Sequence, residues 1–156
     1  MDETCNALDD DCNGSCDEGE MPGCRGGVYR SHGALGHVYG RDEGEVGVLG
    51  QTLERSNYFF VYEEAVDDLV PLYRCEEGSG RRLLTQSASC ESGAEPELVV
   101  GYVAAAERCG ATPLYQLYSR AASNHFYTVS ASERDNAVAV HGYVDEGVAA
   151  WIWATP

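Results

Sequence analysis

The fold is predicted from the stretch "PLYQLYSRAASNHFYTVSASERDNAVAVHGYVDEGVAAWIW", residues 113–153. It holds four short runs rich in aromatic and β-branched residues, "PLYQLY", "HFYTV", "HGYVDEG" and "AAWIW", separated by polar or glycine-containing segments. Runs of this kind predict β-strands. Between the second and third runs, "SASERDNAVAV" starts with a serine followed by Glu and Arg, which predicts a short helix. The stretch therefore predicts four strands and one helix.

The same pattern occurs three times along the chain. Its leading tyrosines, Tyr29, Tyr73 and Tyr115, are 44 and 42 residues apart, and the chain ends 41 residues after the last of them. We expect a main domain of residues 28–156 built from three units, 28–70, 71–112 and 113–156. Near-equal repeats that fill a domain to its end favour a closed object over an open solenoid.

Four strands in each of three units predict an all-β domain of about twelve short strands. The simplest such fold is β-trefoil-like, because closing the barrel leaves few sheet edges exposed. A three-bladed propeller is the alternative, and it is disfavoured because propellers typically have four or more blades.

The third unit resembles a repeat family of unknown function, whose pattern is LYR-(Y/L)-Y-N, then D-H-F-Y-T-T, then E-R-D, then G-Y-x-x-E-G. The likeness is close in residues 113–156 and loose in residues 28–70, where Gly36 and His37 stand in place of Asn124 and His125. The family occurs on secreted bacterial and fungal proteins, sometimes beside polysaccharide hydrolases. The resemblance therefore implies secretion and, from that company, carbohydrate binding.

The polar residues on and after the second strand of the third unit form the candidate ligand site. Sugars are held by an aromatic face together with a carboxylate, amide or imidazole that converges on it. Each of these residues also has a structural alternative, such as capping the helix, while Trp151 and Trp153 are assigned to the core. The candidates are Asn124, His125, Tyr127, Glu133, Arg134 and Asp135.

The chain is strongly acidic, with 26 acidic and 10 basic residues and a formal net charge of −16. This charge argues against nucleic acid and anionic membranes as partners. Residues 1–24 carry eight acids, no Lys or Arg, and four of the seven cysteines. We therefore expect residues 1–27 to form a separate small domain rich in Cys and Asp.

Residues 9–20, "DDDCNGSCDEGE", match a twelve-residue calcium loop, D-x-[DN]-x-[DN]-G-x5-E. Gly14 permits the bend, and the oxygens that a hard cation requires would come from alternate positions of the loop. A solvated acidic run is the alternative. The expected cofactor is calcium, and its expected ligands are Asp9, Asp11, Asn13, Ser15, Asp17 and Glu20.

No helix is expected on either side of this loop, so cysteines would brace it. Disulfides are favoured over zinc because the spacings lack paired CxxC knuckles. Cross-links from Cys5 to Cys12 and from Cys16 to Cys24 are one of three possible pairings. The stretch "ETCNALDDDCNGSCDEG", residues 3–19, also resembles the MopE-type metal-binding motif of secreted bacterial proteins, with departures at Ala7 and Cys16.

Three cysteines lie in the main domain. Cys75 and Cys90 are the preferred pair, and Cys90 with Cys109 is the alternative. With the first pairing, Cys109 would be buried, free or joined to another chain. This use of cysteine indicates an oxidising compartment, so the protein is expected to be secreted or extracellular and bacterial.

The predicted function is a secreted lectin-like module that binds a cell-surface or cell-wall glycan, with a structural calcium site. The alternative is an extracellular protein-interaction module. A glycoside or cell-wall hydrolase is less favoured, because the sequence has no G-x-S-x-G, no HExxH and no phosphate loop. No catalytic residue is assigned, and no run reaches the length that spans a membrane.

Overall fold

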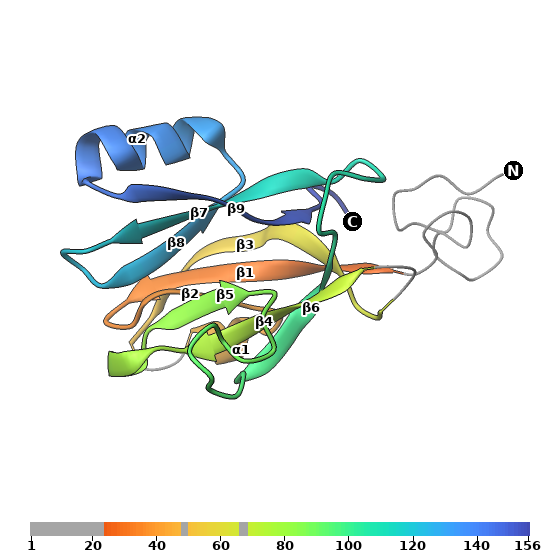
Figure 1. Ribbon diagram of the computed structural model, residues 1–156, viewed down its shortest axis with the longest axis horizontal. Helices are drawn as coiled ribbons and strands as arrows, with labels where there is room; N and C mark the ends of the chain where they lie inside the picture. The colour runs from red at the N-terminus through yellow and green to blue at the C-terminus, as the bar shows by residue number, and fades with distance from the viewer. Residues whose placement is uncertain (1–23, 48–49, 66–68) are drawn as a thin grey trace, which may run out of the picture.

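The computed structural model describes residues 24–47, 50–65 and 69–156. This part of the chain is mostly β, with nine strands, two short α-helices and one 3-10 turn. A six-stranded antiparallel half-barrel has the order β2-β1-β3-β6-β4-β5, and a second sheet has the order β8-β7-β9. In Figure 1 the three-stranded sheet lies over the half-barrel, and helix α2 covers its outer side.

The nine strands form three consecutive strand sets with the same topology. In each set the first strand is central, the second pairs with it as a hairpin, and the third pairs with its other edge. The sets are set one, β1 (Arg25–Gly33), β2 (Gly36–Gly40) and β3 (Thr52–Tyr62); set two, β4 (Val70–Glu76), β5 (Arg82–Thr85) and β6 (Leu98–Val103); and set three, β7 (Thr112–Ser119), β8 (Asn124–Thr128) and β9 (Val144–Ile152).

The third strands of the sets meet one another. Tyr62 on β3 pairs with Tyr102 on β6. Two isolated bridges, Phe60 with Trp153 and Ala104 with Trp151, join the end of β9 to the other two sets. The six- and three-stranded sheets are thus connected where the third strands converge, and Trp153 is buried there, as expected.

The strand count corrects one prediction. The described residues contain three strands per set, and the topology shows no trefoil repeat. In set three, residues 144–147 of the run "HGYVDEG" and residues 149–152 of the run "AAWIW" belong to the single strand β9. The register shifts where Gln116 pairs with Gly147 and Leu117 pairs with Asp145. The segment "DEG" is therefore a β-bulge within one strand and not a break between two strands. A bulge accommodates the positive φ of Gly147 just as a turn would.

A bulge also recurs in the first strand of each set. Its register against the third strand shifts at or beside the leading tyrosine, between Val28 and Arg30 on β1, between Leu72 and Tyr73 on β4, and between Leu114 and Tyr115 on β7. Bulges turn a strand and redirect the side chains that follow. The next residues, Arg30, Arg74 and Gln116, are the ones that build the polar sites described below.

Two helices follow the second strands of sets one and three. Helix α1 (Glu43–Val46) is capped by Asp42, whose side chain accepts from Glu45 N, and α2 (Ala131–His141) is capped by Ser130, which accepts from Glu133 N. Gly142 ends α2 in the left-handed conformation. The helix predicted in residues 130–140 is confirmed.

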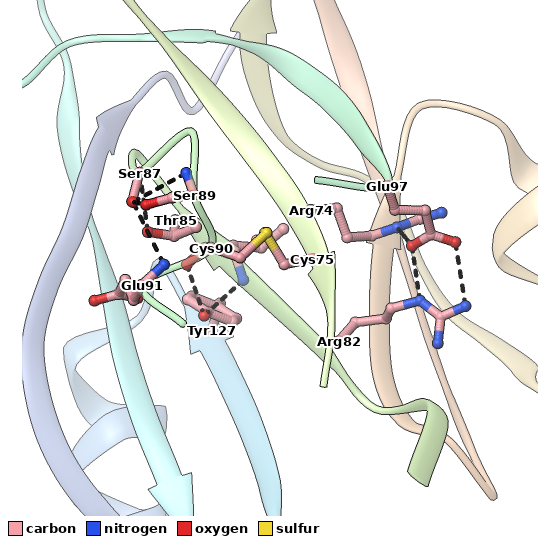
Figure 2. The surroundings of a disulfide bond; sticks show 11 residues. Arg74, Cys75, Arg82, Thr85, Ser87, Ser89, Cys90, Glu91, Glu97 and Tyr127 are labelled. Atoms are coloured by element: carbon pink, nitrogen blue, oxygen red, sulfur yellow. Dashed lines mark hydrogen bonds and ion pairs between the residues drawn. A yellow bond between two sulfur atoms is a disulfide. The ribbon is translucent and has the colours of Figure 1, made fainter. Parts of the chain in front are cut away.

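Tyrosine hydroxyls tie the three sets together inside the core. Tyr39 on β2 exchanges two hydrogen bonds with the backbone of Tyr127 on β8, donating to its carbonyl (2.7 Å) and accepting from its N–H (2.8 Å). Tyr127 in turn donates to the carbonyl of Leu84 on β5 and accepts from its N–H (Figure 2). All three side chains belong to the main buried cluster. Tyr127 is therefore a structural residue.

Candidate functional site

A carboxylate on or just before the third strand links the first and second strands in every set. It contacts the residue after the leading tyrosine and a His or Arg on the second strand. Figure 2 shows this arrangement for set two, where Glu97 lies between Arg74 and Arg82. The three groups are Glu54 with Arg30 and His37, Glu97 with Arg74 and Arg82, and Glu146 with Gln116 and His125.

At the boundary between sets one and two, the charged side chains pair with one another. Arg74 is 1% exposed, and its guanidinium pairs bidentately with Glu45 of α1 at 2.7 and 2.6 Å. Glu97 Oε2 accepts hydrogen bonds from Arg74 Nε (2.9 Å) and from Arg82 Nε (2.8 Å). Two cations and two carboxylates therefore balance at this boundary.

The boundary between sets three and one is open. A cavity of about 430 Å³ lies between β1, β2 and β3 of set one and β8 and α2 of set three. Both charged and aromatic side chains line it. They include Arg30, His32, His37, Glu54, Phe126, Glu133, Asn136, His141 and Tyr143.

Four rings form a continuous series along the cavity. His32 stacks on His37 with ring centres 4.5 Å apart, His37 lies 4.8 Å from Phe126, and Phe126 lies 5.7 Å from Tyr143. The rings come from β1, β2, β8 and the segment after α2, so folding of sets one and three together is required to assemble them.

Asn124 fixes the position and the tautomer of His37. Its Oδ1 accepts from the His37 backbone N–H (3.1 Å), and its Nδ2 lies 3.0 Å from His37 Nδ1. An amide nitrogen only donates, so Nδ1 accepts and the proton of the neutral ring is on Nε2, which faces Glu54. Gly36 makes room for this contact, since a Cβ there would lie 2.1 Å from Asn124 Oδ1.

His37 is neutral at pH 7. Burial lowers its pKa from 6.5 to about 3, and the neighbouring His32 and the positive charge of Arg30 add to the shift. Its contact with Glu54 at 3.7 Å is therefore a polar contact and not an ion pair.

Because of His37, the free energy of unfolding is expected to fall by about 2 kcal/mol between about pH 6.5 and about pH 5. In that range the unfolded chain binds a proton at His37 and the folded chain does not, so stability is lost as the pH falls toward the folded pKa of about 3. Urea unfolding of the protein and of His37→Asn, which keeps an acceptor for Asn124, should show a difference that grows with acidity. Identical pH profiles would contradict a buried neutral His37.

Arg30 is the buried cation of the cavity, with 1% of its side chain exposed. Its guanidinium carbon lies 4.6 Å from the ring centre of Tyr58 and 5.1 Å from that of Phe126. Nη1 lies 3.3 Å from Glu133 Oε1, and Nε lies 3.0 Å from Glu54 Oε2. The Nε–H is not aligned with that oxygen and makes no hydrogen bond within the described residues.

Glu133 reaches the cavity from the first turn of α2. Its Oε1 accepts from Tyr58 Oη (3.2 Å) as well as from Arg30. Burial by itself raises the pKa of Glu133, but hydrogen bonding by the Thr128 hydroxyl and the charge of Arg30 outweigh burial and lower the pKa below its usual value. Glu133 is therefore ionised at neutral pH.

The structure distributes the predicted ligand residues over four places. Glu133 lines the cavity, and Asn124 supports it through His37. His125 follows Asn124 and faces the opposite side of β8, where it lies between Glu77 (3.0 Å) and Glu146 (3.3 Å). Tyr127 is in the core, and Arg134 and Asp135 pair with each other on α2.

Sequence reasoning missed the contribution of set one to this site. The aligned positions of the three units already match His37 with His125, and the strand registers place Tyr39, Leu84 and Tyr127 at equivalent positions. That alignment could have directed attention to His37. It could not show that Glu133 in the first turn of α2 would contact Arg30 on β1 and Tyr58 on β3.

The disulfide predictions are tested in part. Cys75 and Cys90 are bonded, as predicted, with their Cα atoms 5.8 Å apart (Figure 2). Cys24 and Cys109 each take part in a disulfide bond as well, so Cys109 is not a free thiol. Disulfides indicate an oxidising compartment, which agrees with an extracellular location.

The predicted calcium site lies outside the described residues, as do Cys5, Cys12 and Cys16. The ligands concerned are Asp9, Asp11, Asn13, Ser15, Asp17 and Glu20. Among residues 24–47, 50–65 and 69–156, no group of three His, Cys, Asp or Glu side chains could hold a metal ion. No helix in the described part of the chain is long and apolar enough to cross a membrane.

A protein-family model, described as a domain of unknown function (DUF5648), matches residues 37–153 of the 156. The chain belongs to this family. The DUF5648 match includes β2 from its second residue, β3 and all strands of sets two and three, and it supports the resemblance to a repeat family of unknown function noted above. A search of the curated proteins and a search of the solved structures each found no match.

Proposed function

We propose that this DUF5648 domain is a secreted carbohydrate-binding, lectin-like module, and that the cavity between sets one and three is its binding site. One observation carries the proposal: aromatic rings and several polar groups converge on a cavity of about 430 Å³. Small-molecule sites combine apolar walls with a few placed polar groups, and a sugar needs both, since its ring has C–H faces and its rim has hydroxyls.

The cavity offers a hydrogen-bond acceptor that the protein itself does not use. Glu54 uses Oε2 for its contacts with Arg30 and His37, and its Oε1 has no hydrogen bond within the described residues. A sugar hydroxyl can donate to Glu54 Oε1, whose side chain is 35% exposed.

The charges support binding over hydrolysis. A glycosidase needs one carboxylic acid whose pKa is raised so that it can donate a proton. Glu133 has a lowered pKa, and both Glu133 and Glu54 are paired with Arg30. We therefore propose no catalytic role for this pair. Recognition of an extracellular protein is the alternative function.

The N-terminal segment is proposed to hold calcium in a structural role, on the strength of its loop motif. A glycan-array screen of the full chain with and without EDTA separates the two possible roles. Binding that survives EDTA would leave calcium structural, and binding lost with EDTA would place calcium in recognition.

Two exposed lining residues test the site without disturbing the core. His32→Ala and Asn136→Ala should each weaken saccharide binding about threefold to tenfold, since one lost hydrogen bond is worth about 1 kcal/mol. Val140→Ala is the matched control, because Val140 is on the same helix as Asn136, is 67% exposed, and does not line the cavity. Calorimetric titration of the glycan found on the array gives the affinities.

Unchanged affinity in both lining variants would exclude this cavity. If no glycan on the array binds, the carbohydrate proposal fails and protein recognition becomes the better account.

A further inference from the structure

We propose that the saccharide in this cavity carries a protonated amino group, so that the preferred ligand is an amino sugar with a free amine. This inference rests on the proposed function and names its ligand class.

The cavity has more negative than positive charge. Glu54 and Glu133 both contact the single guanidinium of Arg30, which leaves one carboxylate charge in excess. His37 adds no charge at neutral pH. The whole chain has a formal charge of −16, which raises the local concentration of cationic ligands and lowers that of acidic ones.

The positive charge in the cavity is not available to an acidic sugar. Arg30 is 1% exposed and lies between the rings of Tyr58 and Phe126, so its guanidinium is already enclosed. The carboxylates are accessible, since the side chains of Glu54 and Glu133 are 35% and 33% exposed. Oε1 of Glu54 has no hydrogen bond within the described residues and can accept from an ammonium group.

The equivalent boundary between sets one and two shows the contrast. There Glu45 and Glu97 face two cations, Arg74 and Arg82, and the charges balance. In set one, His37 occupies the position that Arg82 occupies in set two. The replacement of an arginine by a neutral histidine accounts for the excess carboxylate in the cavity.

The experiment compares three oligosaccharides of equal length in a buffer acidic enough to protonate a sugar amine. They are oligomers of glucosamine, of N-acetylglucosamine and of galacturonic acid. The glucosamine oligomer should bind about tenfold more tightly than its acetylated form, because one hydrogen bond to a charged group contributes about that much to affinity. The acidic oligomer should bind most weakly.

Asn136 provides a matched pair of variants, because it lines the cavity on the exposed side of α2. Asn136→Asp should strengthen glucosamine binding, and Asn136→Lys should weaken it and favour the galacturonic acid oligomer. Glu107→Gln, an exposed acid that does not line the cavity, should leave the order unchanged. Thermal unfolding confirms that each variant is folded.

Equal binding of the glucosamine and N-acetylglucosamine oligomers, with no response to either Asn136 variant, would overturn the amine proposal and leave carbohydrate binding in place. A stronger affinity for the acidic oligomer would also overturn it. If none of the three binds and the wider array also shows no ligand, both proposals fail together.

Discussion

Replacing Arg74 by alanine is expected to destabilise the domain by about 3–5 kcal/mol, the range for removing one partner of a buried ion pair. The Arg74 guanidinium is 1% exposed and contacts Glu45, Glu97 and the carbonyl of Tyr39, so it joins α1 and β2 of set one to β4 of set two. Alanine would leave both carboxylates without this cation and a hole where the side chain was packed. Urea unfolding monitored by tryptophan fluorescence gives the free energy of unfolding.

Arg82→Ala is the control for this change. Arg82 pairs with the same Oε2 atom of Glu97 (Figure 2), but its side chain is 14% exposed. Pairs nearer the surface contribute about 1 kcal/mol or less. A loss as small for Arg74→Ala as for Arg82→Ala would show that burial does not make the inner pair essential.

The second large effect concerns the disulfide of set two. Replacing Cys75 and Cys90 together by alanine should lower the free energy of unfolding by about 3 kcal/mol, which is the chain-entropy value for a closed loop of about 15 residues. The bond spans a sequence separation of 15 and connects β4 to the loop after β5. Alanine avoids burying a new hydroxyl, since both cysteines are almost fully buried.

Ser87→Ala is the control variant, and it measures how much hydrogen bonds within the loop after β5 contribute to stability. The Ser87 hydroxyl accepts from the backbone N–H groups of Ser89 and Glu91 (Figure 2), at 3.3 and 3.4 Å, so its loss should cost about 1 kcal/mol or less. If the double cysteine variant were no less stable than Ser87→Ala, loop closure would not be the source of stability here.

Much of the fold could be predicted from the repeats. The leading tyrosines located the first strand of each set. The run "HFYTV" located β8, and the segment after Ser130 located α2. The errors arose at "DEG", where a glycine with positive φ lies in a bulge within β9. Local sequence does not distinguish a turn from a bulge, because the choice depends on whether the partner strand continues on the other side.

The candidate site was only half predicted, for a related reason. Glu133 was assigned to a ligand site from its own unit, but its partners Arg30 and Tyr58 come from set one. Tyr127 was assigned to the ligand although its hydroxyl is used by the backbone of Leu84 in set two. Contacts between sets have no signature in one unit, so sequence could suggest the residue types but not their neighbours.

The most direct test of the binding site is to titrate the full chain with the saccharide found on the array and to follow backbone amide shifts by NMR. We expect the largest shifts at His32, His37, Phe126, Asn136 and Tyr143, which line the cavity between sets one and three. Shifts confined to Gln116, His125 and Glu146, which contact one another away from the cavity, would contradict this site and place recognition at the boundary with set two.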